Sequence, residues 1–96
     1  MKCIFIVYNI AIHDEILEAL KKVDLSDYTR WEEVTGVGEK SGPHLNTHIW
    51  PAKNSAMIIV AEEEKVALLM EEIRSLQEEM PGVGLKAFCL ALEDCI

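Results

Sequence analysis

The sequence is poor in the residues that mark secreted or nucleic-acid-binding proteins. It has three cysteines, an odd number with no Cys-x-x-Cys pair, so it makes no disulfide framework. Lysine and arginine total 9 against 17 acidic residues, and the formal net charge is −8. The clustered positive charge that a phosphate backbone requires is therefore missing. These scarcities argue against a nucleic-acid partner and favour a reducing compartment.

A long hydrophobic run is missing as well. The first continuous apolar stretch covers only Cys3 to Tyr8, which is shorter than a signal sequence or a membrane span requires. We therefore expect a cytoplasmic protein without membrane insertion. A chain of 96 residues fits one domain, and we expect residues 1–96 to form a single unit.

What is present alternates between strand and helix patterns. Four stretches rich in β-branched and aromatic residues predict strands over residues 2–9, 28–35, 55–61 and 83–92. Apolar stripes at helical spacing predict a helix over residues 12–23 and a second one that ends before Pro81 and Gly82. The order β-α-β-β-α-β predicts a ferredoxin-like α+β sandwich, in which an antiparallel sheet carries two helices on one face.

The strands over residues 2–9 and 55–61 are apolar on both faces, as buried strands are. Two helices on one side of the sheet leave the other side without cover. An uncovered apolar face on a small protein usually marks an interface. We therefore predict a homo-oligomer that packs its sheets together.

The most distinctive stretch is TGVGEKSGPHLNTHIWPAKN, residues 35–54, which holds three of the five glycines and two of the three histidines. His44 and His48 form a His-x-x-x-His pair, and imidazole suits zinc, copper or nickel. Zinc normally takes at least three protein ligands, so another residue or another subunit would complete the site. The alternatives for this pair are a structural or partner-contact role in the loop, and acid-base catalysis.

Two short stretches, together with the order of elements, resemble the PII signalling proteins. GVGEKSG at residues 36–42 is similar to the GxGxxxG stretch that opens the T-loop of that family, and PGVGLKAF at residues 81–88 is similar to its B-loop. The resemblance implies a homotrimeric regulator, not an enzyme, with effector sites between subunits. By this resemblance the ligand-binding residues are Gly36, Gly38 and Gly42 at the base of the T-loop, and Gly82, Gly84 and Lys86 in the B-loop.

The sequence also departs from that family. No tyrosine lies between Gly36 and Asn54, and residues 80–85 lack the threonine and the additional lysine that help the family to hold nucleotide phosphates. With so little positive charge in that loop, we do not expect a nucleotide as cofactor. We expect instead a trimeric sensor whose short T-loop binds a metal ion or a small effector and signals to a partner such as a metal transporter.

Two other functions remain open at this point. One is a nucleotide-binding regulator of the PII type, and the other is a small dimeric enzyme built on the ferredoxin-like fold. The architecturally similar CutA proteins, which are associated with divalent-cation tolerance, add weight to a metal-linked role by analogy. A trimer with an exposed loop would favour a regulator, whereas a dimer with a closed apolar pocket would favour an enzyme.

Overall fold

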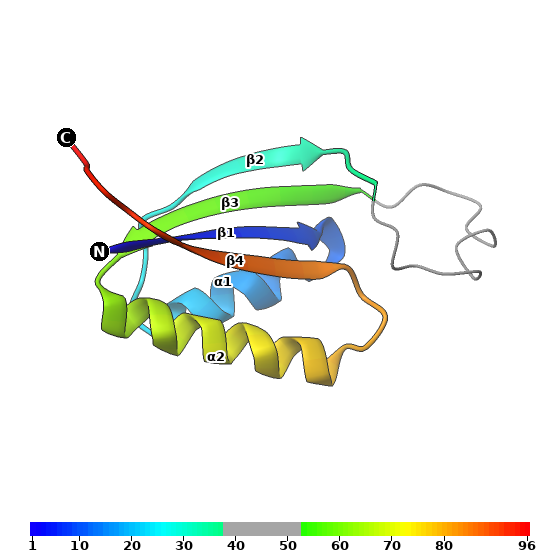
Figure 1. The fold of residues 1–96 in the computed structure, drawn as a ribbon. Coiled ribbons are helices and arrows are strands. Elements are labelled where there is room, and N and C mark those ends of the chain that lie inside the picture. The colour runs from blue at the N-terminus through cyan, green and yellow to red at the C-terminus, as the bar shows by residue number, and fades with distance from the viewer. Residues whose placement is uncertain (38–52) are drawn as a thin grey trace.

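The computed structural model describes residues 1–37 and 53–96, which form a four-stranded sheet with both helices on one face (Figure 1). Every strand pair is antiparallel, and the strand order is β2-β3-β1-β4. The elements are β1 (Lys2–Asn9), the 3-10 turn η1 (Ile10–Ile12), α1 (His13–Lys22), β2 (Thr29–Val34), β3 (Asn54–Ala61), α2 (Glu63–Glu79) and β4 (Leu85–Ala91). The predicted ferredoxin-like α+β arrangement is confirmed.

The element bounds differ from the predicted ones mainly at turns. β4 begins at Leu85 because the preceding residues form a turn in which the Val83 amide bonds the Met80 carbonyl at 3.2 Å. α1 begins at His13 because a 3-10 turn precedes it, and the Asn9 side chain caps that turn by accepting the Ala11 amide at 2.8 Å. Both differences come from hydrogen bonds that an apolar pattern does not encode.

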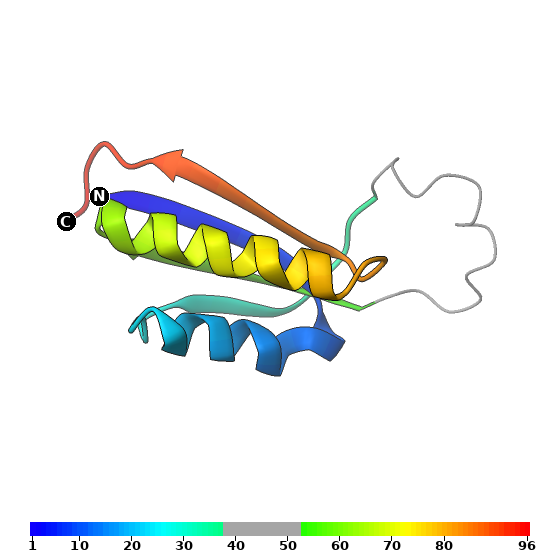
Figure 2. The ribbon, with the colours of Figure 1, turned by 90° about the horizontal axis from the view of Figure 1, so that it is seen from below.

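The core lies between the sheet and the two helices, which run side by side beneath the strands (Figure 2). Along β1 every second side chain points toward the helices, and Ile4, Ile6 and Tyr8 are fully buried. The largest buried partners from the other elements are Ile16 and Leu20 of α1, Met57 and Ile59 of β3, and Val66, Leu69 and Ile73 of α2. No helix in the described ranges is long and apolar enough to cross a membrane.

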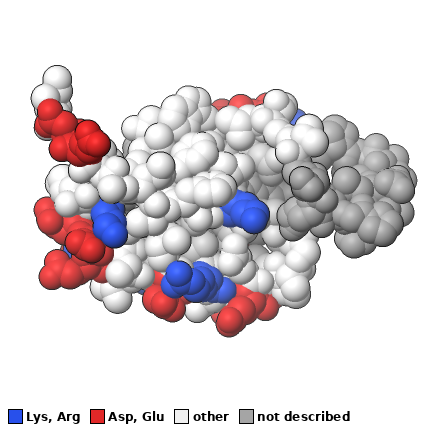
Figure 3. All heavy atoms as spheres, in the orientation of Figure 1, with Lys and Arg blue, Asp and Glu red and all other residues white. Residues whose placement is uncertain are grey.

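The expectation that β1 is buried on both faces was wrong for the single subunit. The residues on the far side of β1 are only partly buried, since neither α1 nor α2 lies on that side. The side chains there are nevertheless apolar, and Figure 3 shows a broad, mostly uncharged area over the strands, with one basic group inside it and the other charged groups toward its borders. This finding agrees with the uncovered apolar surface that the sequence predicts.

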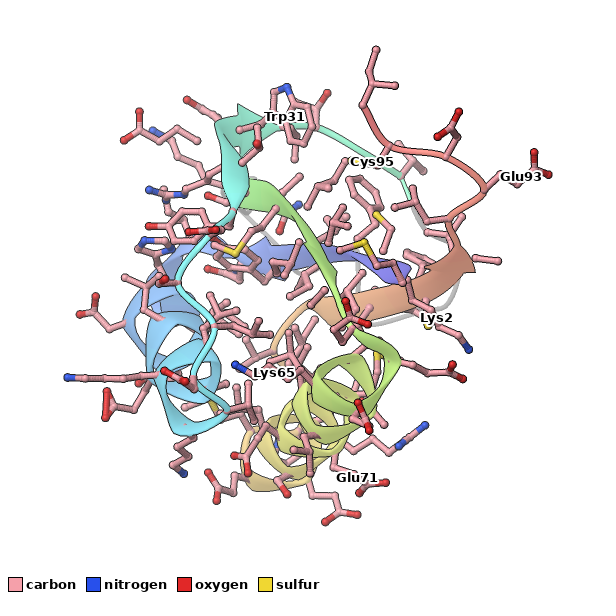
Figure 4. The ribbon with its side chains drawn as sticks, turned by 90° about the vertical axis from the view of Figure 1, so that its left-hand side faces the viewer. Lys2, Trp31, Lys65, Glu71, Glu93 and Cys95 are labelled. Atoms are coloured by element: carbon pink, nitrogen blue, oxygen red, sulfur yellow. The ribbon has the colours of Figure 1, made fainter. Side chains whose placement is uncertain are left out.

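We call this surface the open face, and define it by Phe5, Trp31, Val60, Phe88 and Leu90. Phe88 is 49% exposed and Leu90 is 50% exposed, although both are large apolar residues. The rings of Phe5 and Phe88, from neighbouring strands, stack with their centroids 6.3 Å apart. Figure 4 shows Trp31 on the side of β2 that faces away from both helices. The open face is therefore an apolar surface that neither α1 nor α2 covers.

The alternation along β1 leads to a first prediction. Replacement of Ile6, which is fully buried, in an Ile6→Ala variant should lower the free energy of unfolding by about 2–5 kcal/mol, because a cavity forms in the core. Leu68→Ala on α2 is the matched control, since Leu68 is 55% exposed and the change should cost well under about 1 kcal/mol. Urea titrations of both variants measure the difference, and equal losses would contradict the described packing.

Candidate ligand-binding site

Three parts of the chain meet at the right-hand end of the sheet in Figure 1. β1 ends there at Asn9, which is paired with Asn54 at the start of β3. The Asn9 amide donates to the Gly84 carbonyl at 2.9 Å, and the Ile10 amide donates to the Lys53 carbonyl, also at 2.9 Å. We call this junction of Asn9, Lys53, Asn54 and Gly84 the loop base, since the segment between β2 and β3 returns to the sheet at this point.

The glycines near the loop base differ in what they require. Gly82 has a φ of 90° in the turn before β4, where a side chain would be strained. Among residues 1–37 and 53–96, a Cβ on Gly84 would meet only the Asn54 Oδ1 at 3.9 Å, and a Cβ on Gly36 would meet nothing within 4 Å. Contacts with these described residues therefore do not require glycine at positions 36 and 84, and they leave the backbone there open to a close approach.

Lys86 supplies a positive charge next to this open backbone. It lies two residues after Gly84 in β4 and pairs with Val7, which places it on the same side of the sheet as the open face. Its side chain is exposed, and no carboxylate of residues 1–37 or 53–96 forms an ion pair with it. An exposed cation close to a glycine backbone suits an anionic group.

The residues singled out in the sequence are only partly within the described ranges. Gly36 follows the end of β2, and Gly82, Gly84 and Lys86 lie in and after the turn before β4. Four others lie outside the described residues, namely Gly38, Gly42, His44 and His48. Within residues 1–37 and 53–96 no group of three or more metal-binding side chains is assembled. The metal site therefore stays a prediction.

A polar cluster on the helix side of the sheet was missed by the sequence analysis. The Tyr8 hydroxyl and His13 Nδ1 are 2.8 Å apart, and the two rings stack with an interplanar angle of 11°. Beside them, Arg30 Nη2 donates to Ser55 Oγ at 3.1 Å, and Ser55 Oγ donates to the Glu32 carbonyl at 2.6 Å. Two features of the sequence could have indicated this cluster: Tyr8 is a polar aromatic residue at the end of an apolar strand, and Arg30 is a charged residue within another strand.

Burial and the charge of Arg30 set the protonation states in this cluster. Burial lowers the pKa of His13, and the positive charge of Arg30 lowers it further, whereas Asp14 and Glu32 act in the opposite direction. Burial raises the pKa of Tyr8, against the lowering effect of Arg30. Both rings are therefore neutral near pH 7, and the Tyr8 hydroxyl and His13 Nδ1 are joined by one hydrogen bond.

The lowered pKa of His13 leads to a second prediction. The unfolded chain binds a proton at His13 near the ordinary pKa of 6.5, whereas the folded chain binds it only at lower pH. Between these two values the unfolded state holds more protons, so the free energy of unfolding should fall as the pH drops below 6.5. Urea titrations across this range, compared with a His13→Asn variant, isolate the contribution. Parallel pH profiles of the two proteins would rule it out.

The architecture and the loop base together define a class, that of small ferredoxin-like α+β domains with a glycine-containing turn beside the ends of the segment that joins β2 and β3. The family model for nitrogen regulatory protein P-II matches the chain over residues 1–96. The protein therefore belongs to the P-II family of regulatory signalling proteins. None of the curated proteins compared with the chain matches it.

Solved structures of similar proteins agree with this fold. One is described as a putative PII-like signalling protein from Thermus thermophilus, with 21% identity, a TM-score of 0.61, and coverage of 92% of this chain and 82% of that chain. Another is CPII from Thiomonas intermedia bound to ADP, AMP and acetate, with 18% identity, a TM-score of 0.68, and coverage of 93% of this chain and 82% of that chain.

A further structure of CPII is bound to ADP and bicarbonate, with 18% identity, a TM-score of 0.66, and coverage of 93% of this chain and 84% of that chain. At these identities the likeness to solved structures establishes the fold. The CPII structures hold ADP, so they do not support our expectation that this chain binds no nucleotide.

Proposed function

We propose that this P-II family member is a trimeric regulator that binds a small anionic ligand at the loop base and reports its presence to a partner protein. The observation that carries the proposal is the open backbone at Gly84 beside the exposed Lys86. An anion can form hydrogen bonds with backbone that it can approach closely, and a nearby cation compensates its negative charge.

The amount of positive charge at the loop base indicates which anionic ligands fit best. The CPII structures hold ADP, AMP, acetate or bicarbonate, which all carry a phosphate, carboxylate or carbonate group. In this chain, with its net charge of −8, the loop base and the start of β4 offer two exposed lysines, Lys53 and Lys86. Two lysines compensate a single negative charge well and a polyphosphate less completely. We therefore place bicarbonate and small carboxylates before the adenine nucleotides as ligands.

The open face supports the trimer. Phe5, Phe88 and Leu90 form an exposed apolar surface of the kind that soluble proteins bury between subunits. Lys86 lies on the same side of the sheet, in the same strand as Phe88 and Leu90. Packing of the open faces would therefore bring a neighbouring subunit close to Lys86, and the ligand would bind where two subunits meet.

The third prediction is that the protein forms a trimer and that Lys86 contributes to ligand affinity. Native mass spectrometry should show a trimer, and calorimetry should show binding of bicarbonate or ADP. In a Lys86→Met variant the affinity should fall by about tenfold or more, the effect of one charge-assisted hydrogen bond. Lys21→Met, an exposed lysine on α1, is the matched control. Unchanged affinity in Lys86→Met would exclude this site, and a dimer without bound ligand would favour the enzyme alternative.

A second candidate ligand is a transition metal ion, favoured by the His-x-x-x-His spacing of His44 and His48. A metal ion held by this pair would restrain the segment between β2 and β3 and so create a docking surface only in the bound state. A transporter of the same ion is the kind of partner that such a sensor would regulate.

The fourth prediction tests this metal role. Zinc, copper or nickel should add to the wild-type protein in whole-number steps per subunit, measured by native mass spectrometry. A His44→Ala, His48→Ala double variant should lose this uptake, because zinc needs several protein ligands at once. His13→Asn is the control, since His13 Nδ1 already bonds Tyr8. Equal uptake by the double variant would exclude the pair as ligands.

A further inference from the structure

The ladder between β2 and β3 is interrupted close to the loop base. Trp31 pairs with Ala56, and the next pair is Val34 with Asn54. Between these pairs β2 advances by three residues and β3 by two, so β2 carries one extra residue. This is the geometry of a β-bulge, in which Glu32 and Glu33 lie opposite Ser55.

A side chain replaces the backbone hydrogen bonds that the bulge interrupts. The Ser55 hydroxyl donates to the Glu32 carbonyl at 2.6 Å and accepts from Arg30 Nη2 at 3.1 Å. Ser55 has no exposed surface, and among the described residues it is the one polar side chain buried in the core. Loss of the hydroxyl would leave the partly buried Glu32 carbonyl and Arg30 guanidinium each without this partner, so this link holds β2 and β3 together at the bulge.

The position of Arg30 is unfavourable for stability. Tyr8, His13 and Ser55, which surround its guanidinium, carry no negative charge, and the buried Nε has no hydrogen-bond partner among residues 1–37 and 53–96. A partly buried cation without a carboxylate partner costs free energy. Unfavourable groups of this kind collect where a geometry is needed for function.

Ser55 is also directly connected to the loop base. The preceding residue, Asn54, pairs with Asn9, and its Oδ1 is the atom nearest to the position of a Cβ on Gly84. A shift of β3 at Ser55 would therefore move Asn54 relative to Gly84. The link at the bulge is therefore one residue away from Asn54, which lies beside Gly84 at the candidate ligand site.

We infer that Ser55 and Arg30 are positioning residues, which hold the bulged end of β2 against β3 and thereby set the geometry of the ligand site at Asn54 and Gly84. This inference rests on the proposed function, because it assigns a role in ligand binding to residues that do not contact the ligand. It also predicts a local change that is measurable without any ligand.

The fifth prediction compares Ser55→Ala with Ser55→Thr, which keeps the hydroxyl. In Ser55→Ala, amide hydrogen exchange should become about tenfold or more faster in residues 29–36 and 53–56, and should stay unchanged in β1 and β4. The affinity for bicarbonate or ADP should fall by a similar factor. Ser55→Thr should restore slow exchange and affinity, because the donor to the Glu32 carbonyl is present again.

A second variant covers the case in which Ser55→Ala fails to fold. Arg30→Met removes the charge and the bond to Ser55 but leaves the bond from Ser55 to Glu32, so it should show a smaller change in exchange at the same residues. Faster exchange spread evenly over all strands would overturn the inference, since the residues would then serve only overall stability. Variants that show locally faster exchange but bind the ligand with normal affinity would also overturn the inference.

The same experiment separates the two proposals. A wild-type protein that binds neither bicarbonate nor ADP would overturn the proposed function, and the local exchange pattern would then decide alone whether Ser55 and Arg30 fix the loop base. A wild-type protein that binds, together with variants that bind equally well and exchange equally slowly, would overturn the inference and leave the proposed function intact.

Discussion

Burial of one side of the sheet against two helices is the constraint on which the rest of this structure depends. Ile4, Ile6 and Tyr8 point toward the helices, and strand geometry then directs the residues between them to the other side. A slip of one residue in register would exchange the two sides, so the core fixes the pairing of β1 with both of its neighbours. The same alternation that buries Ile4, Ile6 and Tyr8 places the residues between them on the open face.

The register also places the functional groups. Asn9 meets Asn54 and Gly84 because β1 lies between β3 and β4, although these residues are far apart in the sequence. The single extra residue in β2 then changes the direction of the chain near its exit from the sheet, and the buried hydroxyl of Ser55 holds that change in place. A rigid sheet end on one side and open backbone on the other is a suitable arrangement for a site that must respond to a ligand.

The sequence predicts the order of elements, because the period of the apolar residues switches clearly between strand and helix and Pro81 with Gly82 ends α2. It also predicts the uncovered apolar face, and the resemblance points to the turn that carries Gly84 and Lys86. The polar cluster could not be predicted. Arg30 and Ser55 are 25 residues apart, and only the three-dimensional register brings them together. Tyr8 closes an apolar run, so its hydroxyl was not recognised as part of a polar cluster.

The open face also affects how the protein is made. Phe88 and Leu90 are half exposed in a single subunit, and of the four strands theirs is the last to leave the ribosome. In the proposed trimer each new subunit would hide this surface only after it has met two others, so dilution would leave it in water. The cellular amount of such a protein would then set the fraction that is assembled, and a cell that makes too little would hold single chains with this apolar surface exposed.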